Sequence, residues 1–172
     1  GLPVFPALIS ISCEAVGGKS ETAVAFGEAI VIITGAADLH DDVIDQSFFK
    51  GPKKTVLGKF GSSVTILSGD TMLIEGITKL YKQAELIDKK QGRTVVDLVT
   101  SAVFEISKAE TLEYRLRSKG FGIRPREYQE IIRQKAIVPE LAMRIGAILG
   151  NGDSERIESL GRFGRTYGYL TT

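Results

Sequence analysis

Cysteine and histidine are almost absent from this sequence, and tryptophan is missing altogether. The 172 residues include one cysteine, Cys13, and one histidine, His40. A single cysteine cannot form a disulfide within the chain, and one residue of each type argues against a zinc site built from Cys and His. We therefore expect a protein of the reducing cytoplasm, whose chemistry rests on other side chains.

The sequence also lacks an excess of charge of either sign. Lysine and arginine together number 22 and aspartate and glutamate 21, which leaves a net charge of +1. Proteins that bind nucleic acid or an anionic membrane surface usually carry a basic excess, so the composition gives no electrostatic case for either partner. An anionic ligand would have to be bound by a local group of residues.

Long hydrophobic runs are missing too. The most apolar stretch spans residues 29–37 and is bounded by Glu28 and Asp38. A membrane-spanning helix needs about 20 apolar residues, so we expect no transmembrane segment. The first eleven residues have neither the basic region nor the cleavage pattern of a signal peptide. A long apolar ligand could still be held in a cavity.

Helical patterns account for most of what is present. Apolar spacing, caps and stop residues predict one all-α domain over residues 1–172, without repeats or linkers. The expected helices cover residues 3–15, 21–47, 62–81, 94–117, 125–149, and 153 or 154 to the end. The second is apolar nearly all round, which indicates a central buried helix. Residues 48–60 contain glycines, a proline and four lysines, which indicate a basic loop.

Three aspartates lie within about one turn at the end of that apolar helix. Asp41 and Asp45 are four residues apart and share one helix face, whereas Asp42 lies about 100° round the helix. Their mutual repulsion costs stability unless a cation or hydrogen bonds offset it. Mg²⁺ suits such a group because it binds oxygen ligands, uses few carboxylates and completes its shell with water and substrate phosphates. The alternative is a solvated helix end whose acids pair with nearby lysines.

The segment His40-Asp41-Asp42-Val43-Ile44-Asp45 resembles the first aspartate-rich motif of the trans-prenyl diphosphate synthase family. Further resemblances to that family follow in the same order along nearly the whole chain. They are Phe60-Gly61, Leu67-Ser68-Gly69-Asp70, Ala109-Glu110, Ile132-Arg133-Gln134-Lys135-Ala136, Gly146-Ala147-Ile148-Leu149-Gly150 and Phe163-Gly164-Arg165-Thr166-Tyr167-Gly168. None of the later motifs is specific by itself, but their order and spacing are.

The resemblance implies an isoprenoid-synthase-type helical bundle around a central cavity. It also implies a polyprenyl diphosphate synthase reaction, in which an allylic diphosphate ionises and the alkene of isopentenyl diphosphate attacks the cation. Mg²⁺ held by Asp41, Asp42 and Asp45 would bridge to the allylic diphosphate, which Lys135 would also contact. Family members are commonly homodimers, and a heteromer with a catalytic homologue is the alternative assembly.

The same resemblance assigns expectations to positions near the motif. Ala37 and Ala36, four and five residues before Asp41, stand where bulky residues block the product tunnel in the family. Their small side chains predict a product of about twenty carbons or longer, or alternatively close helix packing. We expect His40 and Asp70 to act through packing or hydrogen bonds rather than as metal ligands.

The sequence departs from the family mainly where the two diphosphates would be bound. Family residues are replaced at Leu2, Phe5, Thr34, Phe49, Glu110 and Ala136. Each lost charge-assisted hydrogen bond would weaken diphosphate binding by roughly 1.5–3 kcal/mol. Lys50 and the other lysines of residues 48–60 are candidate replacements, although they also fit a solvated loop.

The family carries a second aspartate-rich motif in its later half. This chain ends at Thr172 within a helical pattern, so we expect it to be truncated before that motif. Three functions remain open. They are an active prenyltransferase, a regulatory subunit that binds an allylic diphosphate beside a catalytic partner, and a related enzyme that ionises an allylic diphosphate without a second substrate.

Overall fold

The structure, a computed structural model, describes residues 4–118 and 124–171. These residues form α1 (Val4–Ala15), α2 (Ser20–Ile44), β1 (Phe49–Lys50), β2 (Lys53–Lys54), α3 (Val56–Ala84), α4 (Lys89–Ser118), α5 (Pro125–Lys135), α6 (Ile137–Leu149) and α7 (Ser154–Thr171). The expected all-α fold is confirmed, with a short antiparallel hairpin added. Leu2 and the glycines expected to end the fourth helix, Gly120 and Gly122, lie outside the described residues.

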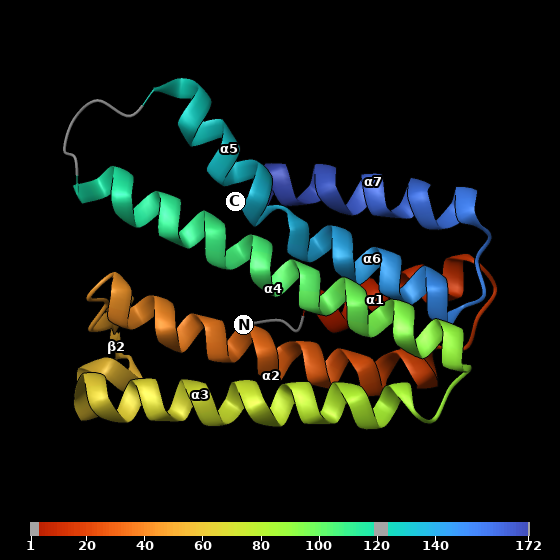
Figure 1. Cartoon of the computed structure of the whole chain (residues 1–172), viewed down its shortest axis with the longest axis horizontal. Helices are drawn as coiled ribbons and strands as arrows, with labels where there is room; N and C mark the ends of the chain where they lie inside the picture. Colours follow the sequence, from red (N-terminus) through yellow and green to blue (C-terminus); the bar gives the residue numbers. More distant parts are fainter. Residues whose placement is uncertain (1–3, 119–123, 172) are drawn as a thin grey trace.

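The helices form a bundle in which α2 and α3 run side by side in opposite directions (Figure 1). The hairpin lies at the end of the bundle where α2 leads into α3. Helix α1 packs against both α2 and α6, and α7 covers α6. The core is built from aliphatic and aromatic side chains that are less than a tenth exposed, among them Ile9, Phe26, Ile33, Leu80, Val95, Val99 and Ile145.

Helix α2 is the expected long apolar helix, but it is buried on one side. Phe26, Ile30 and Ile33 recur at helical spacing and lie in the core, whereas Val24 and Val31 are 49% and 43% exposed. The expectation of burial all round was therefore wrong within the described residues. By length and composition, α2 is also the one helix among those residues that could cross a membrane, a criterion that core helices of soluble proteins satisfy too.

The helix expected over residues 125–149 is divided into α5 and α6 at Ala136. Pro139 supplies the physical reason, because it has no N–H group to donate to the carbonyl of Lys135 four residues earlier. The helix begins again at Ile137, which leaves Pro139 in the first turn, where a missing donor is tolerated. The break places Lys135 at the very end of α5.

Helix α3 begins at Val56 rather than at the expected Ser62 or Ser63. Thr55 caps it, since its Oγ1 accepts a hydrogen bond from the Gly58 N–H at 3.0 Å. The expected start coincides with a break at Gly61, whose backbone is non-helical with φ of 80°. The hairpin and the extra first turns of α3 therefore occupy much of the segment that was expected to be a loop.

Glycines in residues 146–150 allow α1 and α6 to approach closely. A Cβ atom on Gly146 would lie 1.9 Å from Ser12 Oγ and 2.0 Å from the Ile9 carbonyl oxygen. A Cβ atom on Gly150 would lie 2.5 Å from the Cys13 carbonyl oxygen. Backbone atoms cannot yield to such contacts, so this family-like motif has a packing role.

We predict that Gly146→Ala lowers the unfolding free energy by about 2 kcal/mol or more, because overpacking at this site displaces backbone. Thermal unfolding would report a fall in midpoint of about 5 °C. Gly35→Ala is the matched control, because its new methyl would meet only the flexible end of Met72, at 3.0 Å. We expect the control midpoint to stay or rise, since alanine favours a helix interior. Equal effects of the two substitutions would contradict the packing account.

Candidate functional site

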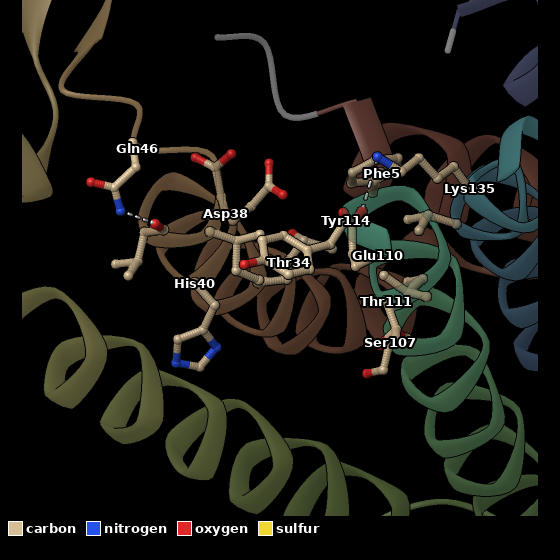
Figure 2. Close-up of a pocket in the computed structure, with 16 residues that line it drawn as sticks. Phe5, Thr34, Asp38, His40, Gln46, Ser107, Glu110, Thr111, Tyr114 and Lys135 are labelled. Atoms are coloured by element: carbon tan, nitrogen blue, oxygen red, sulfur yellow. Dashed lines mark hydrogen bonds and ion pairs between the residues drawn. The ribbon is translucent and has the colours of Figure 1, made fainter. Parts of the chain in front are cut away.

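A cavity of about 830 Å³ lies between α2 and α4, with α1 and the end of α5 also contributing to its wall (Figure 2). Its charged and polar lining includes Thr34, Asp38, His40, Asp41, Gln46, Ser107, Glu110, Thr111 and Lys135. Its apolar lining includes Phe5, Ala37, Val43, Ile44, Ile106 and Val138. The cavity therefore offers both ionic groups and an apolar wall.

The aspartate motif occupies the last turn and the C-cap of α2, as the sequence predicts. Asp45 is the cap residue, and its N–H donates to the Asp41 carbonyl oxygen at 2.8 Å. Asp41 lines the cavity, whereas Asp42 is only 4% exposed and accepts a hydrogen bond from Lys50 Nζ at 3.1 Å. The structure thus separates Asp42 from the cavity.

Lys135 reaches the same cavity from the end of α5, and two glutamates of α4 hold it there. Its Nζ lies 3.0 Å from Glu110 Oε1 and is also paired with Glu113 (Figure 2 shows the first contact). Arg117, one turn further along α4, pairs with both Glu113 and Asp45. Ion pairs therefore connect the end of α5 through α4 to the end of α2.

Crowding of carboxylates changes the acidity of Asp41. Burial, followed by the neighbouring charges of Glu110 and Asp45, raises the pKa of Asp41 to about 6, although Lys135 opposes the change. Burial also disfavours charge on Lys135, but hydrogen bonds and attraction to Glu113 and Glu110 outweigh it and raise the pKa of the lysine. Lys135 is thus positively charged at neutral pH, while the carboxylates around Asp41 lack full compensation.

Other residues expected at the site are divided between the cavity and the interior. Thr34 lines the cavity, but its hydroxyl donates to the Ile30 carbonyl oxygen at 2.9 Å. Ala37 also lines it, whereas Ala36 is fully buried and outside the lining. Lys50 is not among the lining residues, because its Nζ lies between Asp38 Oδ1 at 2.7 Å and Asp42 Oδ1 at 3.1 Å.

His40 and Asp70 contact each other, as their expected hydrogen-bonding role requires. His40 Nε2 lies 3.1 Å from Asp70 Oδ1. The imidazole also lies close to Gly69, where an added Cβ atom would be 2.5 Å from Nε2. The Gly69-Asp70 pair in α3 thereby leaves space for the His40 ring and binds it. This contact links α3 to the turn of α2 that carries the aspartate motif.

Glu113, Arg117 and Asp38 belong to this arrangement but were not predicted from the sequence. Glu110, Glu113 and Arg117 are spaced by three and four residues, which places them on one face of α4. Asp38 lies four residues before Asp42, on the same face of α2. These spacings were visible in the sequence, but the elements that would meet each face were not.

The carboxylates at the cavity fit a divalent cation in their chemistry. Among the described residues, no three acidic, histidine or cysteine side chains are placed together closely enough to hold a metal unaided. Mg²⁺ does not require this, because it binds through one or two carboxylates together with water and substrate phosphates. Asp41 and Asp45 share a face, and burial together with the charges of Glu110 and Asp45 raises the pKa of Asp41, so a cation bound there would favour its ionised form.

Comparisons with known proteins agree on one family. Residues 4–170 match the family model described as Polyprenyl synthetase. A geranylgeranyl diphosphate synthase of Methanosarcina mazei is 27% identical over 98% of this chain and 51% of its own length. A short chain isoprenyl diphosphate synthase of Methanothermobacter thermautotrophicus is 26% identical over the same shares of the two chains.

Solved structures agree with the sequence comparison. The crystal structure of a geranylgeranyl pyrophosphate synthetase from Pyrococcus horikoshii has a TM-score of 0.93 and 26% identity, and covers 98% of this chain and 51% of that one. The isoprenoid-synthase type of helical bundle is thereby confirmed. The chain spans about half the length of the curated relatives it matches.

We predict that Asp41→Asn stabilises the metal-free protein at about pH 7.5. Because the pKa of Asp41 is raised from 3.8 to about 6, the folded state holds this proton more tightly than the unfolded chain. Its contribution to stability is therefore lost as the pH rises from about 4 to 6. A neutral asparagine avoids that loss, and we expect the thermal midpoint to rise by about 2 °C or more.

The same measurement at about pH 4 should show little difference, because Asp41 is then protonated in the folded state. Asp97→Asn is the control, since Asp97 is exposed and its pair with Arg93 spans 3.8 Å. We expect this control to change the midpoint by less than about 1 °C at either pH. A thermal unfolding midpoint for Asp41→Asn below that of the wild-type protein at pH 7.5 would contradict the crowding of carboxylates around Asp41.

Proposed function

The chain belongs to the polyprenyl synthetase family, and from this premise we propose that the whole protein is a Mg²⁺-dependent prenyltransferase. It would join an allylic diphosphate to isopentenyl diphosphate. One observation carries the proposal. Asp41 from α2 and Lys135 from α5 line one cavity, and most of the surface that its lining residues expose is apolar. A diphosphate head and a hydrocarbon tail need that combination.

The chain's own residues would act on the allylic diphosphate in distinct ways. Asp41 and Asp45 would hold Mg²⁺, and we retain Asp42 as a proposed ligand that must first part from Lys50. The metal, when bound, would neutralise the diphosphate and help it leave as an anion. Lys135 would place a positive charge beside the departing diphosphate. Phe5, Ile106 and Val138 would keep water away from the allylic carbons.

Binding would require a rearrangement of ion pairs. Glu110 and Glu113 hold Lys135 in the structure, so the diphosphate must compete with two carboxylates for it. Glu110 and Glu113 would lose a positive partner when Lys135 turns to the substrate, and the charge of a bound Mg²⁺ would offset that loss. We therefore propose that Glu110, which stands where the family usually has glutamine, makes diphosphate binding depend more strongly on Mg²⁺. Diphosphate binding by Glu110→Gln, measured over a range of Mg²⁺ concentrations, would contradict this if it depended on Mg²⁺ as strongly as binding by the wild-type protein.

Binding of isopentenyl diphosphate has less structural support than binding of the allylic diphosphate. Phe5 replaces a basic family residue and presents an aromatic ring to the cavity, and Thr34 directs its hydroxyl to its own helix. A regulatory subunit that binds only the allylic diphosphate therefore remains the alternative.

Product length also stays a prediction. Ala37 leaves the cavity wall open, in favour of about twenty carbons or more, and the length of labelled product would measure it.

We also propose that the whole protein forms a homodimer, as the family resemblance implies. Helix α3 leaves Val64, Leu67, Ile74 and Ile77 exposed by 37–67%. Along α3, these four residues are separated by three, seven and three positions, and the order of the separations is the same from either end of the helix. An antiparallel pair of α3 helices around a two-fold axis would bring like groups together. Sedimentation of a monomer at micromolar concentration would contradict this assembly.

Turnover by the whole protein tests the proposed activity. We expect Mg²⁺-dependent incorporation of labelled isopentenyl diphosphate into longer chains, with allylic primers of about ten to twenty carbons. Lys135→Met should lower kcat by about 10²- to 10³-fold, because it removes a charge that stabilises the leaving group. Lys82→Met, on an exposed part of α3, should have no effect.

The outcomes separate the candidate functions. Incorporation that is insensitive to Lys135→Met would contradict the assigned role of the lysine. Absence of product with every primer would reject the prenyltransferase and favour the regulatory subunit, provided that the allylic diphosphate still binds. Release of diphosphate from the allylic substrate alone would favour an enzyme without a second substrate.

A further inference from the structure

The hairpin between α2 and α3 concentrates positive charge and exposed aromatic rings. Residues 46–69 contain four lysines and three phenylalanines, and no aspartate or glutamate. The whole chain has a net charge of only +1, so this segment differs sharply from the average. A local basic patch of this kind can attract an anionic membrane surface even though the net charge of the whole chain is close to zero.

The register of the hairpin places aromatic and basic groups on its outer side. Phe49 pairs with Lys54 and Lys50 with Lys53, and directly paired residues project from the same face of a ladder. Lys50 is bound to Asp38 and Asp42 of α2, which turns the face of Lys50 toward that helix. The face with Phe49 and Lys54 is consequently turned away from α2. Phe49 is 59% exposed and its neighbour Phe48 is 46% exposed.

Hydrogen bonds fix this hairpin in place. Thr55 Oγ1 donates to the Ser47 carbonyl oxygen at 2.7 Å, and the Thr55 N–H donates to the Phe48 carbonyl oxygen at 3.1 Å. Gly58 lies so close to Phe48 that an added Cβ atom would be 2.1 Å from the Phe48 carbonyl oxygen. These contacts fix the backbone of the segment that carries the two partly exposed phenylalanine rings.

Three lysines on or beside the hairpin are not neutralised within the part of the chain that the structure describes. Lys54 lies on the outer face with Phe49, Lys53 lies on the face of Lys50, and Lys59 lies in the first turns of α3. Lys53, Lys54 and Lys59 are exposed, and none of them has a carboxylate within ion-pair distance among the described residues. They differ in this from Lys50, which has two carboxylate partners. A patch that combines aromatic rings with uncompensated lysines matches an anionic lipid interface, where rings enter the headgroup region and ammonium groups meet phosphates.

We propose that this hairpin, with Phe48, Phe49, Lys53, Lys54 and Lys59, docks the protein on an anionic lipid surface. The hairpin lies at the end of the bundle where α2 finishes (Figure 1), and Ile44 and Gln46 at that end of α2 line the cavity. Single-stranded nucleic acid is the less suitable partner, because its sites extend over about four or more nucleotides and the neighbouring cavity presents Asp38 and Asp41. The inference goes beyond the proposed function and does not require catalysis.

Vesicle co-sedimentation of the whole protein tests the docking surface. The vesicles would contain phosphatidylcholine alone, or phosphatidylcholine with about a third phosphatidylglycerol. We expect at least fivefold more protein on the anionic vesicles at low salt, and a marked decrease on adding salt. Lys53→Glu with Lys54→Glu should abolish the preference, and Phe49→Ser should reduce binding at least threefold while keeping the preference for anionic vesicles.

Lys89→Glu with Lys90→Glu is the matched control, because these exposed lysines start α4 at the opposite end of the bundle (Figure 1). It makes the same change of charge and should alter binding less than twofold. Thermal unfolding would verify that every variant is folded. The proposal is overturned if the wild-type protein ignores anionic vesicles, if both double variants lose binding equally, or if an oligo-dT competes the protein off the vesicles through the same residues.

Discussion

The need to neutralise carboxylates crowded around the end of α2 governs the arrangement of the charged groups in this part of the molecule. Helix α2 ends in three aspartates, and α4 adds Glu110 and Glu113. Asp41 and Glu110 line the cavity, whereas the other three carboxylates lie outside its lining. Every basic group nearby is engaged by them. Lys50 binds Asp42, Arg117 connects Asp45 with Glu113, and Lys135 is held by both glutamates. Asp41 differs, because burial and the charges of Glu110 and Asp45 outweigh the effect of Lys135 and raise its pKa to about 6.

This arrangement has a consequence for binding. A cation that joins Asp41 and Asp45 would replace part of the compensation that Lys135 and Arg117 now provide. Lys135 would then be available to an anion, so the cation and a diphosphate are expected to bind cooperatively. The fold supports the exchange, because the break at Ala136 leaves Lys135 at the end of α5, where its long side chain can change direction with little backbone movement.

Sequence patterns predicted the helices and the family well, because apolar spacing and ordered motifs are local or near-local features. The structure places Asp41, Ala37 and Lys135 in the lining of one cavity. The roles that the resemblance implies for them stay predictions. The partners of the charged groups could not be predicted in this way. Whether Asp42 meets a metal or Lys50 depends on the path of a hairpin, and whether Ala36 faces a tunnel depends on how α2 is rotated. Those are properties of packing between distant segments.

Calorimetric titration with an inert thiolo analogue of an allylic diphosphate tests the central claim, that the aspartate motif and Lys135 together bind a Mg²⁺–diphosphate. The account predicts binding by the whole protein that requires Mg²⁺ and weakens at least tenfold in Asp41→Asn, a variant whose fold should be more stable and not less. Equal affinity with and without Mg²⁺, or equal affinity of the wild-type protein and Asp41→Asn, would contradict it.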